Sequence, residues 1–408
     1  MINFFINALA ASAGGGLTYL KGIIPCLDDR RDVRTTVLVP SRLARVFNGQ
    51  YETVRLITHE AGSSAGRRMW WEQTQLRNVL RQYGANLLLS TGNFALRNSP
   101  IPQILLSRNA LYTCPYFYDD LLARGEYRFW LSARAQRWLA LRSLRWADST
   151  IAPTGAFARE LAACTETHVA VVPHGFHLGE FFREDIPCPD ELQHKLQVRD
   201  GTLRLLFVSH YNYYRNFETL FRALPLVKAK LGRKIKLFLT CGLRPDANPG
   251  NYRPEAAAGL INDLGLRDEV VELGSVPYEC LNHLYRSCDL YVTAAYAESF
   301  GHPLVEAMAS GLPIIASDLP VHQEICGHAA VYFPKFSPEE LANTISKLAE
   351  EPSRMQEMAE CGRERARAFS WKAHVEGVLK IAESLVASSV TGIGHQPLTS
   401  ATTPSLGV

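Results

Sequence analysis

Short apolar runs alternate along the chain with longer segments whose apolar residues recur at helical spacing. The runs lie at residues 2–9, 34–40, 53–58, 86–90, 102–106 and 150–154, and later at 203–208, 236–240, 270–274, 290–295 and 313–316. Between two of them, residues 67–83 place Met69, Leu76 and Leu80 on one helical stripe. This alternation predicts an α/β protein built on parallel sheets, with ligand groups where the strands end.

The stretch from Glu298 to Gly311 has the pattern of a strand end, a glycine turn and a helix. The turn falls at Gly301, Pro303 suits the first turn of a helix, and Gly311 suits its C-terminal cap. Backbone N–H groups at such a helix N-terminus favour a phosphate. Carboxylates on both sides of the turn, Glu298 and Glu306, can accept hydrogen bonds from the hydroxyls of a sugar or ribose.

This whole string resembles the Glu-x7-Glu signature of the GT-B glycosyltransferases, most closely the retaining enzymes of family 4, and residues 313–318 agree with that family too. The resemblance implies a GT-B fold, with two Rossmann-like domains facing across a cleft. It places Glu298 near the donor sugar and has Glu306 bind the ribose of the nucleotide. The turn residues would bind the donor as well: Ser299, Phe300, Gly301 and His302.

Pattern and resemblance together predict the domain organisation. An N-terminal Rossmann-like acceptor domain spans residues 1–180 and is joined by a C-terminal helix at 372–386. A linker rich in Asp, Glu and Pro follows at 181–202, and a C-terminal nucleotide-sugar domain spans 203–371. Residues 387–408 are rich in Ser, Thr, Gly and Pro without periodicity, so we expect a disordered tail.

The loop after the run at 203–208 carries the candidate cations. Family members usually have Gly-Arg and a later lysine here, and these two cations hold the donor diphosphate; this chain has Ser209-His210 and Arg215. Arg215 offers a planar fork suited to phosphate oxygens, whereas His210 is a weaker cation near neutral pH. We therefore expect donor binding to weaken as pH rises. A later loop resembles the family's nucleobase contact and assigns that role to Val276 and Pro277.

Two loops in the N-terminal half are candidates for the acceptor side. Gly14, Gly15 and Gly16 follow the first strand and permit close backbone approach to a ligand, and the resemblance places them in the cleft. Many family members carry a histidine after the strand at 102–106, aimed at the donor sugar. This chain has Arg108-Asn109 there, and either side chain can donate a hydrogen bond in place of the histidine.

Two helical segments raise the question of membrane contact. Residues 124–147 contain six arginines, and four of them share a helix side with Leu131 and Trp138, while small residues occupy the opposite side. Charge and apolar bulk are not segregated, so a solvated or domain-contact face is favoured, and weak contact with a membrane or lipid acceptor stays open. Trp70 and Trp71 fit core packing, with a membrane-facing pair as the alternative.

Composition and charge narrow the class of protein. With 408 residues, 47% hydrophobic and 20% charged, the chain is typical of a globular protein of two domains, and a net charge of +3 gives no argument for nucleic acid. The nine cysteines form no Cys-x-x-Cys pair, which favours a reduced interior over disulfides or zinc. The uncharged first twenty residues lack the basic start of a signal peptide. We expect a cytoplasmic protein that can lie peripherally on the inner face of the membrane.

The expected chemistry is transfer of a sugar from a nucleotide-sugar donor to a glycan or lipid-linked saccharide. Asp-x-Asp, which holds a metal in many glycosyltransferases, occurs nowhere in the chain, so we expect no metal and no cofactor. Glu298, Arg215 and His210 are the predicted catalytic residues. The resemblance implies retention of configuration, with the departing phosphate oxygen taking the acceptor proton. Three alternatives stay open: a hydrolase pair formed by the two glutamates, a nucleotide-sugar 2-epimerase, and a non-catalytic sugar-binding homologue.

Overall fold

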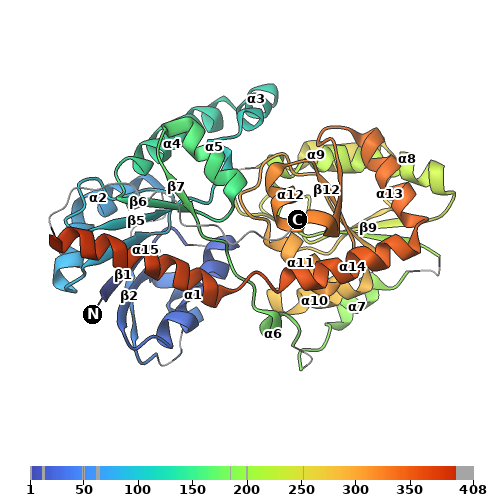
Figure 1. The fold of residues 1–408 in the computed structure, drawn as a ribbon. Coiled ribbons are helices and arrows are strands. Elements are labelled where there is room, and N and C mark those ends of the chain that lie inside the picture. Colours follow the sequence, from blue (N-terminus) through green and yellow to red (C-terminus); the bar gives the residue numbers. More distant parts are fainter. Residues whose placement is uncertain are drawn as a thin grey trace. The chain divides into compact units, whose positions relative to one another are not determined.

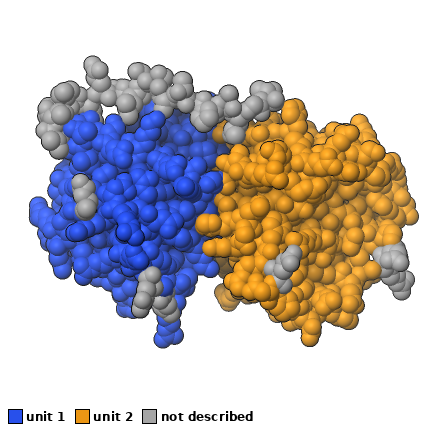
Figure 2. All heavy atoms as spheres, turned by 60° about the horizontal axis from the view of Figure 1, so that its bottom comes forward, with its two compact units in different colours: residues 1–113, 131–175, 370–408 blue, residues 114–130, 176–369 orange. Residues whose placement is uncertain are grey.

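The chain forms two compact units in a computed structural model that describes residues 2–11, 14–47, 49, 51–60, 65–183, 185–198, 201–250 and 252–391. Unit 1 comprises residues 1–113, 131–175 and 370–408, and unit 2 comprises residues 114–130 and 176–369 (Figure 2, blue and orange). Each unit is built on one sheet, and the strand pairs of the described residues are parallel. The predicted α/β class with parallel sheets is confirmed.

Seven strands in the described part of unit 1 form a sheet with the order β3-β2-β1-β4-β5-β6-β7 (Figure 1). Their bounds are β1 Ile2–Asn7, β2 Val33–Pro40, β3 Val54–His59, β4 Leu87–Ser90, β5 Gln103–Leu106, β6 Ser149–Ala152 and β7 Val169–Val171. The order reverses at β1, which pairs with β2 on one side and β4 on the other. Ligand sites of open α/β sheets lie where the strand order reverses, so the loops after β1, β4 and β5 are candidate positions for ligand-binding residues.

The helices of unit 1 cover both faces of its sheet. They are α1 Gly15–Asp28, α2 Ala65–Gln82, α4 Tyr127–Leu144, α5 Gly155–Thr165 and α15 Trp371–Thr391, with short 3-10 helices η1 Ser41–Phe47 and η2 Ala110–Tyr112. The first residues of α4, 127–130, are counted with unit 2. Successive side chains of β1 point to opposite faces. Phe4 and Ile6 therefore join one core with residues of α1 and α15, whereas Phe5 joins a second core with Leu76 and Leu80 of α2.

Six strands in the described part of unit 2 form a sheet with the order β10-β9-β8-β11-β12-β13. The strands are β8 Leu203–Phe207, β9 Ile235–Leu239, β10 Val270–Glu272, β11 Leu290–Thr293, β12 Ile314–Ser317 and β13 Ala330–Phe333. The longer helices are α3 Pro115–Ala123, α8 Phe217–Leu231, α9 Glu255–Asp263, α11 His302–Ser310, α13 Pro338–Ala349 and α14 Pro352–Ala366. The shorter ones are α6 Leu178–Phe181, α7 Asp190–Leu196, α10 Leu281–Ser287, α12 Pro320–Cys326, η3 Tyr213–Arg215, η4 Tyr278–Cys280 and η5 Gly327–Ala329.

Residues 114–130 belong to unit 2 although the flanking chain belongs to unit 1, which the sequence did not predict. Arg124 explains the attachment: its Nη2 lies 2.8 Å from Oε1 of Glu218 on α8, and its Nε lies 2.7 Å from Oδ1 of Asp120. The Tyr296 hydroxyl donates to Oδ2 of Asp120 over 2.7 Å. The Arg124 guanidinium also lies over the Tyr213 ring, 4.2 Å from its centroid. This segment, residues 114–130, thus contacts the loops after β8 and β11.

Two predicted boundaries differ from the structure. The last helix continues to Thr391, so the first residues of the predicted tail at 387–408 are helical; residues 392–408 lie outside the described range. The predicted linker at 181–202 contains α7, because Leu192 and Leu196 are buried on one side of a short amphipathic turn. No helix among the described residues is both long and apolar enough to cross a membrane.

Candidate functional site

The predicted donor residues of unit 2 gather where its strand order reverses. β8 pairs with β9 on one side and with β11 on the other, so the loops after β8 and β11 leave the same edge of the sheet as neighbours. The first loop ends at Arg215 and the second contains Glu298. Nη1 of Arg215 donates to Oε2 of Glu298 over 2.5 Å. Residues 83 positions apart in the sequence therefore meet at the expected ligand position.

The environment of this ion pair keeps both groups charged. Burial by itself would raise the pKa of Glu298, but the Arg215 guanidinium and, more weakly, His322 outweigh burial and lower it. For Arg215, burial acts to lower the pKa, but the Glu298 carboxylate outweighs burial and raises it. The guanidinium therefore stays protonated. Nε of Arg215 is buried and has no hydrogen-bond partner among the described residues. The Glu298 carboxylate therefore leaves one donor of the Arg215 guanidinium unused.

Two left-handed backbone turns place these side chains. Asn216 follows Arg215 with φ 56°, and its Oδ1 accepts a hydrogen bond from the Thr219 amide, which caps α8. Asparagine tolerates this conformation and is a preferred N-cap. Gly301 begins α11 with φ 84°, and a Cβ there would lie 2.9 Å from Cδ1 of Leu304. In both turns, the residue that marks the turn in the sequence is the one that adopts the left-handed conformation.

The predicted helix after the Gly301 turn is confirmed as α11, and its C-cap Gly311 has φ 66°. The buried Glu306 carboxylate on α11 accepts a hydrogen bond from the Tyr285 hydroxyl over 2.7 Å. Burial raises the pKa of Glu306 to about 7, while the Tyr285 hydrogen bond acts to lower it. This carboxyl is therefore poised between its two protonation states near neutral pH.

Other predicted donor residues lie on the same loops. The Ser299 amide donates to Oε1 of Glu298 over 3.1 Å, and the rings of Phe300 and His302 lie 4.9 Å apart. Ser209 Oγ donates to the His210 carbonyl oxygen over 2.7 Å. Burial and, secondarily, the Arg215 charge lower the pKa of His210 below its ordinary value. His210 is therefore a poorer cation than its position suggested.

The predicted nucleobase loop lies on the edge of the same sheet. Val276 and Pro277 follow β10, and Pro277 is the N-cap of η4. Tyr278, the next residue, is near enough to Glu306 for the carboxylate to add to the effect of burial in raising the Tyr278 pKa. Tyr278 also packs against Phe181, with ring centroids 5.7 Å apart. The loop is therefore connected to the Glu306 end of the candidate site.

In unit 1, Arg108 meets the glycine loop. Nη1 of Arg108 donates to the Gly15 carbonyl oxygen over 2.9 Å, and a Cβ on Gly16 would lie 3.1 Å from Nη2 of Arg108. Glycine at position 16 thus permits the close approach of the guanidinium, and a Cβ there would require a small shift of the Arg108 tip. Gly14 precedes α1 with φ 63°, a conformation that favours glycine. Oδ1 of Asn109 accepts a hydrogen bond from the Leu111 amide and caps η2, so this side chain has a structural role.

Three site residues were not predicted from the sequence. Tyr285 holds Glu306, His322 is buried and contributes to the low pKa of Glu298, and the Tyr214 ring lies under the Arg215 guanidinium at 5.1 Å. Nothing in the spacing of Tyr285 or His322 marks them, because each lies on a helix far along the chain from its partner. Tyr214 precedes Arg215 directly, and an aromatic neighbour of a cation was the available signal.

Comparisons with known proteins identify the family of the chain. The model of "Glycosyltransferase Family 4" matches residues 13–180, and that of "Glycosyl transferases group 1" matches residues 190–365. The D-inositol 3-phosphate glycosyltransferase of Nocardia farcinica is 28% identical over 240 residues, which are 57% of this chain and 52% of that protein. The enzyme of the same name from Frankia alni is 30% identical over 215 residues, 52% of each chain. The chain thus spans about half the length of these curated relatives.

Solved structures share the fold along nearly the whole chain. Sucrose-phosphate synthase from Thermosynechococcus elongatus has a TM-score of 0.73 at 18% identity and covers 95% of this chain and 100% of its own. The Anabaena protein HepE in complex with UDP-glucose has a TM-score of 0.70 at 18% identity, covering 94% and 100%. WaaG, a glycosyltransferase involved in lipopolysaccharide biosynthesis, has a TM-score of 0.67 at 17% identity, covering 94% and 99%.

Proposed function

Because the chain belongs to the GT-B glycosyltransferases of family 4, we propose that it transfers a sugar from a nucleotide-sugar donor to a hydroxyl of a glycan or lipid-linked acceptor. We further propose that the transfer retains the anomeric configuration and needs no metal. The observation that carries this proposal is the partly buried Arg215–Glu298 pair at the point where the strand order of unit 2 reverses.

The residues of unit 2 divide the work of holding the donor. The Arg215 guanidinium and the N-terminal amides of α11 offset the charge that develops on the departing diphosphate. The Glu298 carboxylate accepts hydrogen bonds from the donor sugar, and Glu306 accepts them from the ribose hydroxyls. The acceptor proton passes to the departing phosphate oxygen on the same face of the sugar, which leaves the configuration unchanged.

Fixed cations in place of a metal are supported by two observations. Asp-x-Asp does not occur in the 408 residues, and the Glu298 carboxylate raises the pKa of Arg215 and so keeps its guanidinium charged. Activity that persists in excess EDTA is the expected outcome. Activity that EDTA abolishes and a divalent cation restores would overturn this part of the proposal.

The donor class is tested by ligand-induced stabilisation. We expect at least one of UDP-, GDP-, ADP- and dTDP-sugars to raise the unfolding temperature, and we start from UDP-glucose because HepE was solved in complex with it. The same sugar should leave Arg215→Ala with little or no shift. If none of the four donor classes shifts the wild-type protein, the donor site is wrong.

Product analysis separates transfer from the other reactions of this fold. A transferase releases free nucleotide at a rate that depends on the acceptor, and NMR of the product shows the anomeric configuration of the donor. A nucleotide-sugar 2-epimerase interconverts or hydrolyses the donor without any acceptor. Acceptor-independent turnover would therefore assign the site to that second reaction.

A further inference from the structure

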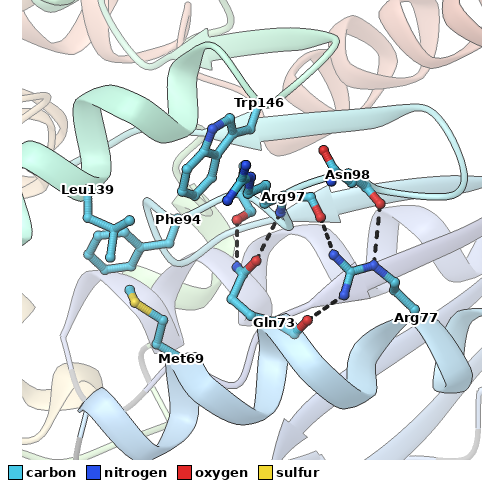
Figure 3. A pocket seen from close by; sticks show the side chains of 9 residues that line it. Met69, Gln73, Arg77, Phe94, Arg97, Asn98, Leu139 and Trp146 are labelled. Atoms are coloured by element: carbon cyan, nitrogen blue, oxygen red, sulfur yellow. Dashed lines mark hydrogen bonds between the residues drawn. The ribbon is translucent and has the colours of Figure 1, made fainter.

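A pocket of about 520 Å³ lies in unit 1 between α2, α4 and the chain after β4. Figure 3 shows Met69 of α2, Phe94, Leu139 of α4 and Trp146 around it. These are flexible, aromatic and branched apolar side chains, a composition typical of sites for apolar ligand groups. None of the residues named above as candidate donor or acceptor groups lines this pocket.

Two polar side chains of the pocket wall, Gln73 and Arg77, are bound to backbone atoms. Gln73 donates to the Ala95 carbonyl oxygen over 2.9 Å and accepts from the Arg97 amide over 3.0 Å. The Arg77 guanidinium donates to the carbonyl oxygens of Gln73, Arg97 and Asn98 (Figure 3). These bonds fix the wall at Gln73 and Arg77. Met69, Phe94, Leu139 and Trp146 supply the apolar part of the pocket, and Arg97 and Asn98 line it as well.

Helix α4 buries one side and exposes arginines and large apolar residues on the other. Its buried residues are Ala133, Ala140, Ser143 and Leu144. The outward side carries Leu131 and Trp138, which are 66% and 59% exposed, together with the exposed Arg134 and Arg142, and the exposed Arg145 follows the helix directly. Residues 131–145 contain four arginines and no Asp or Glu. This face therefore attracts anions.

Helix α2 adds a second exposed tryptophan beside the pocket. Trp71 stacks on His59 with ring centroids 4.0 Å apart, as core packing predicted. Trp70 is instead 67% exposed, and its neighbour Met69 lines the pocket. Trp70, Leu131 and Trp138 are the most exposed large apolar side chains described in unit 1, and they lie on the two helices that line the pocket.

We propose that this α2–α4 face docks on a bilayer containing anionic lipids and that the pocket receives one acyl chain of such a lipid. The exposed arginines pair with lipid phosphates, while Trp70 and Trp138 lie at the headgroup level. Arg142 lies over the Trp138 ring at 4.9 Å, which joins both groups in one contact.

The mixture of charged and apolar residues on one side of α4 fits this arrangement. A free helix that lies in a membrane interface must separate its charges from its apolar side. In α4 the opposite side is already buried in the protein, so the exposed residues of its outward side are available to the lipid surface. The exposed apolar side chains of α4 and the guanidinium groups beside them then lie at different depths of the same membrane interface.

Docking is tested by sedimentation of the full chain with unilamellar vesicles at physiological salt. We expect binding to vesicles of phosphatidylcholine with 30% phosphatidylglycerol and weak binding to phosphatidylcholine alone. Arg134→Glu with Arg142→Glu should lower the partition coefficient at least about tenfold. Arg222→Glu with Arg233→Glu makes the same charge change on exposed residues of unit 2 and should bind like wild type. Unfolding temperatures confirm that both variants are folded.

Pocket occupancy is tested with phosphatidylglycerol brominated along its acyl chains, which quenches nearby tryptophan fluorescence. Trp146 lines the pocket, so wild type should lose more fluorescence than Trp146→Phe, which keeps an apolar wall. Bound vesicles without quenching of Trp146 would overturn the acyl-chain site. Absence of binding to the anionic vesicles, or binding that the Arg134/Arg142 change leaves intact, would overturn the docking face. Binding to heparin but not to these vesicles would assign the arginines to a soluble polyanion instead.

Discussion

The Arg215 guanidinium donates through Nη1 to Oε2 of Glu298 over 2.5 Å, and this bond joins the loops that follow β8 and β11. One partner lies in a loop that ends in η3, and the other precedes the helix turn at Gly301. The pair fixes the position of a cation whose remaining N–H groups can face a phosphate. Substitution of Arg215 therefore removes both a charge from the site and the bond that joins the two loops.

Arg215→Ala should lower kcat by about 10²-fold or more, the typical loss when a charged group that stabilises a transition state is removed. Steady-state kinetics with the donor identified by thermal shift measures the effect. Arg215→Lys keeps the charge but not the planar fork, and we expect it to retain part of the activity. Near-wild-type turnover in Arg215→Ala would remove Arg215 from the mechanism.

Glu306→Ala should raise the donor KM by about tenfold or more, because charged acceptors contribute roughly 1.5–3 kcal/mol per hydrogen bond. kcat should change much less, since ribose binding is the same in the ground and transition states. Comparison of kcat and KM between wild type and variant decides the point. A variant whose kcat falls while KM holds would show that Glu306 acts on the reacting sugar.

Glu306 also predicts a pH dependence of stability. Its pKa is about 7 in the folded protein and its ordinary value is 4.5. The folded state thus binds more protons between these values, and stability falls as pH rises from about 4.5 through about 7. Glu306→Gln should remove about 3 kcal/mol of that fall. Urea unfolding at pH 5 and pH 8 measures it, and equal pH dependence in both proteins would contradict the buried carboxyl.

The environment of His210 changes the pH range in which we expect this residue to affect donor binding, from near neutral to acidic pH. Its pKa is lowered by burial and by Arg215, so the proton is lost below pH 6.5. The protonated form attracts the diphosphate, and the His210 contribution to donor KM should therefore rise with pH only in the acidic range. Donor KM from pH 5.5 to 8.5 in wild type and His210→Gln isolates it from the Glu306 titration. A His210-dependent change between pH 7.5 and 8.5 is the outcome that contradicts this reading.

Gly301→Ala should destabilise the protein by about 1–3 kcal/mol, the usual cost of a left-handed conformation in a non-glycine residue. Its new methyl group would also press on Leu304. Gly259→Ala in α9 is the matched control, because a Cβ there has open space and the backbone is helical, so it should stabilise slightly. Unfolding temperatures of both variants compare them; equal shifts would argue against strain at Gly301.

Much of the fold and part of the site follow from local sequence signals. The strand runs and the glycine turn before Glu306 were predicted because backbone conformation and side-chain alternation are local properties. The attachment of residues 114–130 to unit 2 was not, since it depends on ion pairs such as Arg124–Glu218 between segments 94 residues apart. Tyr285 and His322 were missed for the same reason. The different environments of Trp70 and Trp71 likewise depend on a distant partner, His59.

The attachment of residues 114–130 sets a limit on how the chain can be dissected. A fragment or a chimera divided at residue 175 would take β8 to α14 without α3, leaving Glu218 and Tyr296 without Arg124 and Asp120. A chimera of two relatives would therefore keep these contacts only if residues 114–130 and the sequence after residue 175 come from the same parent. Exchange of the Arg215–Glu298 site between relatives is then tied to a segment encoded in the other half of the chain.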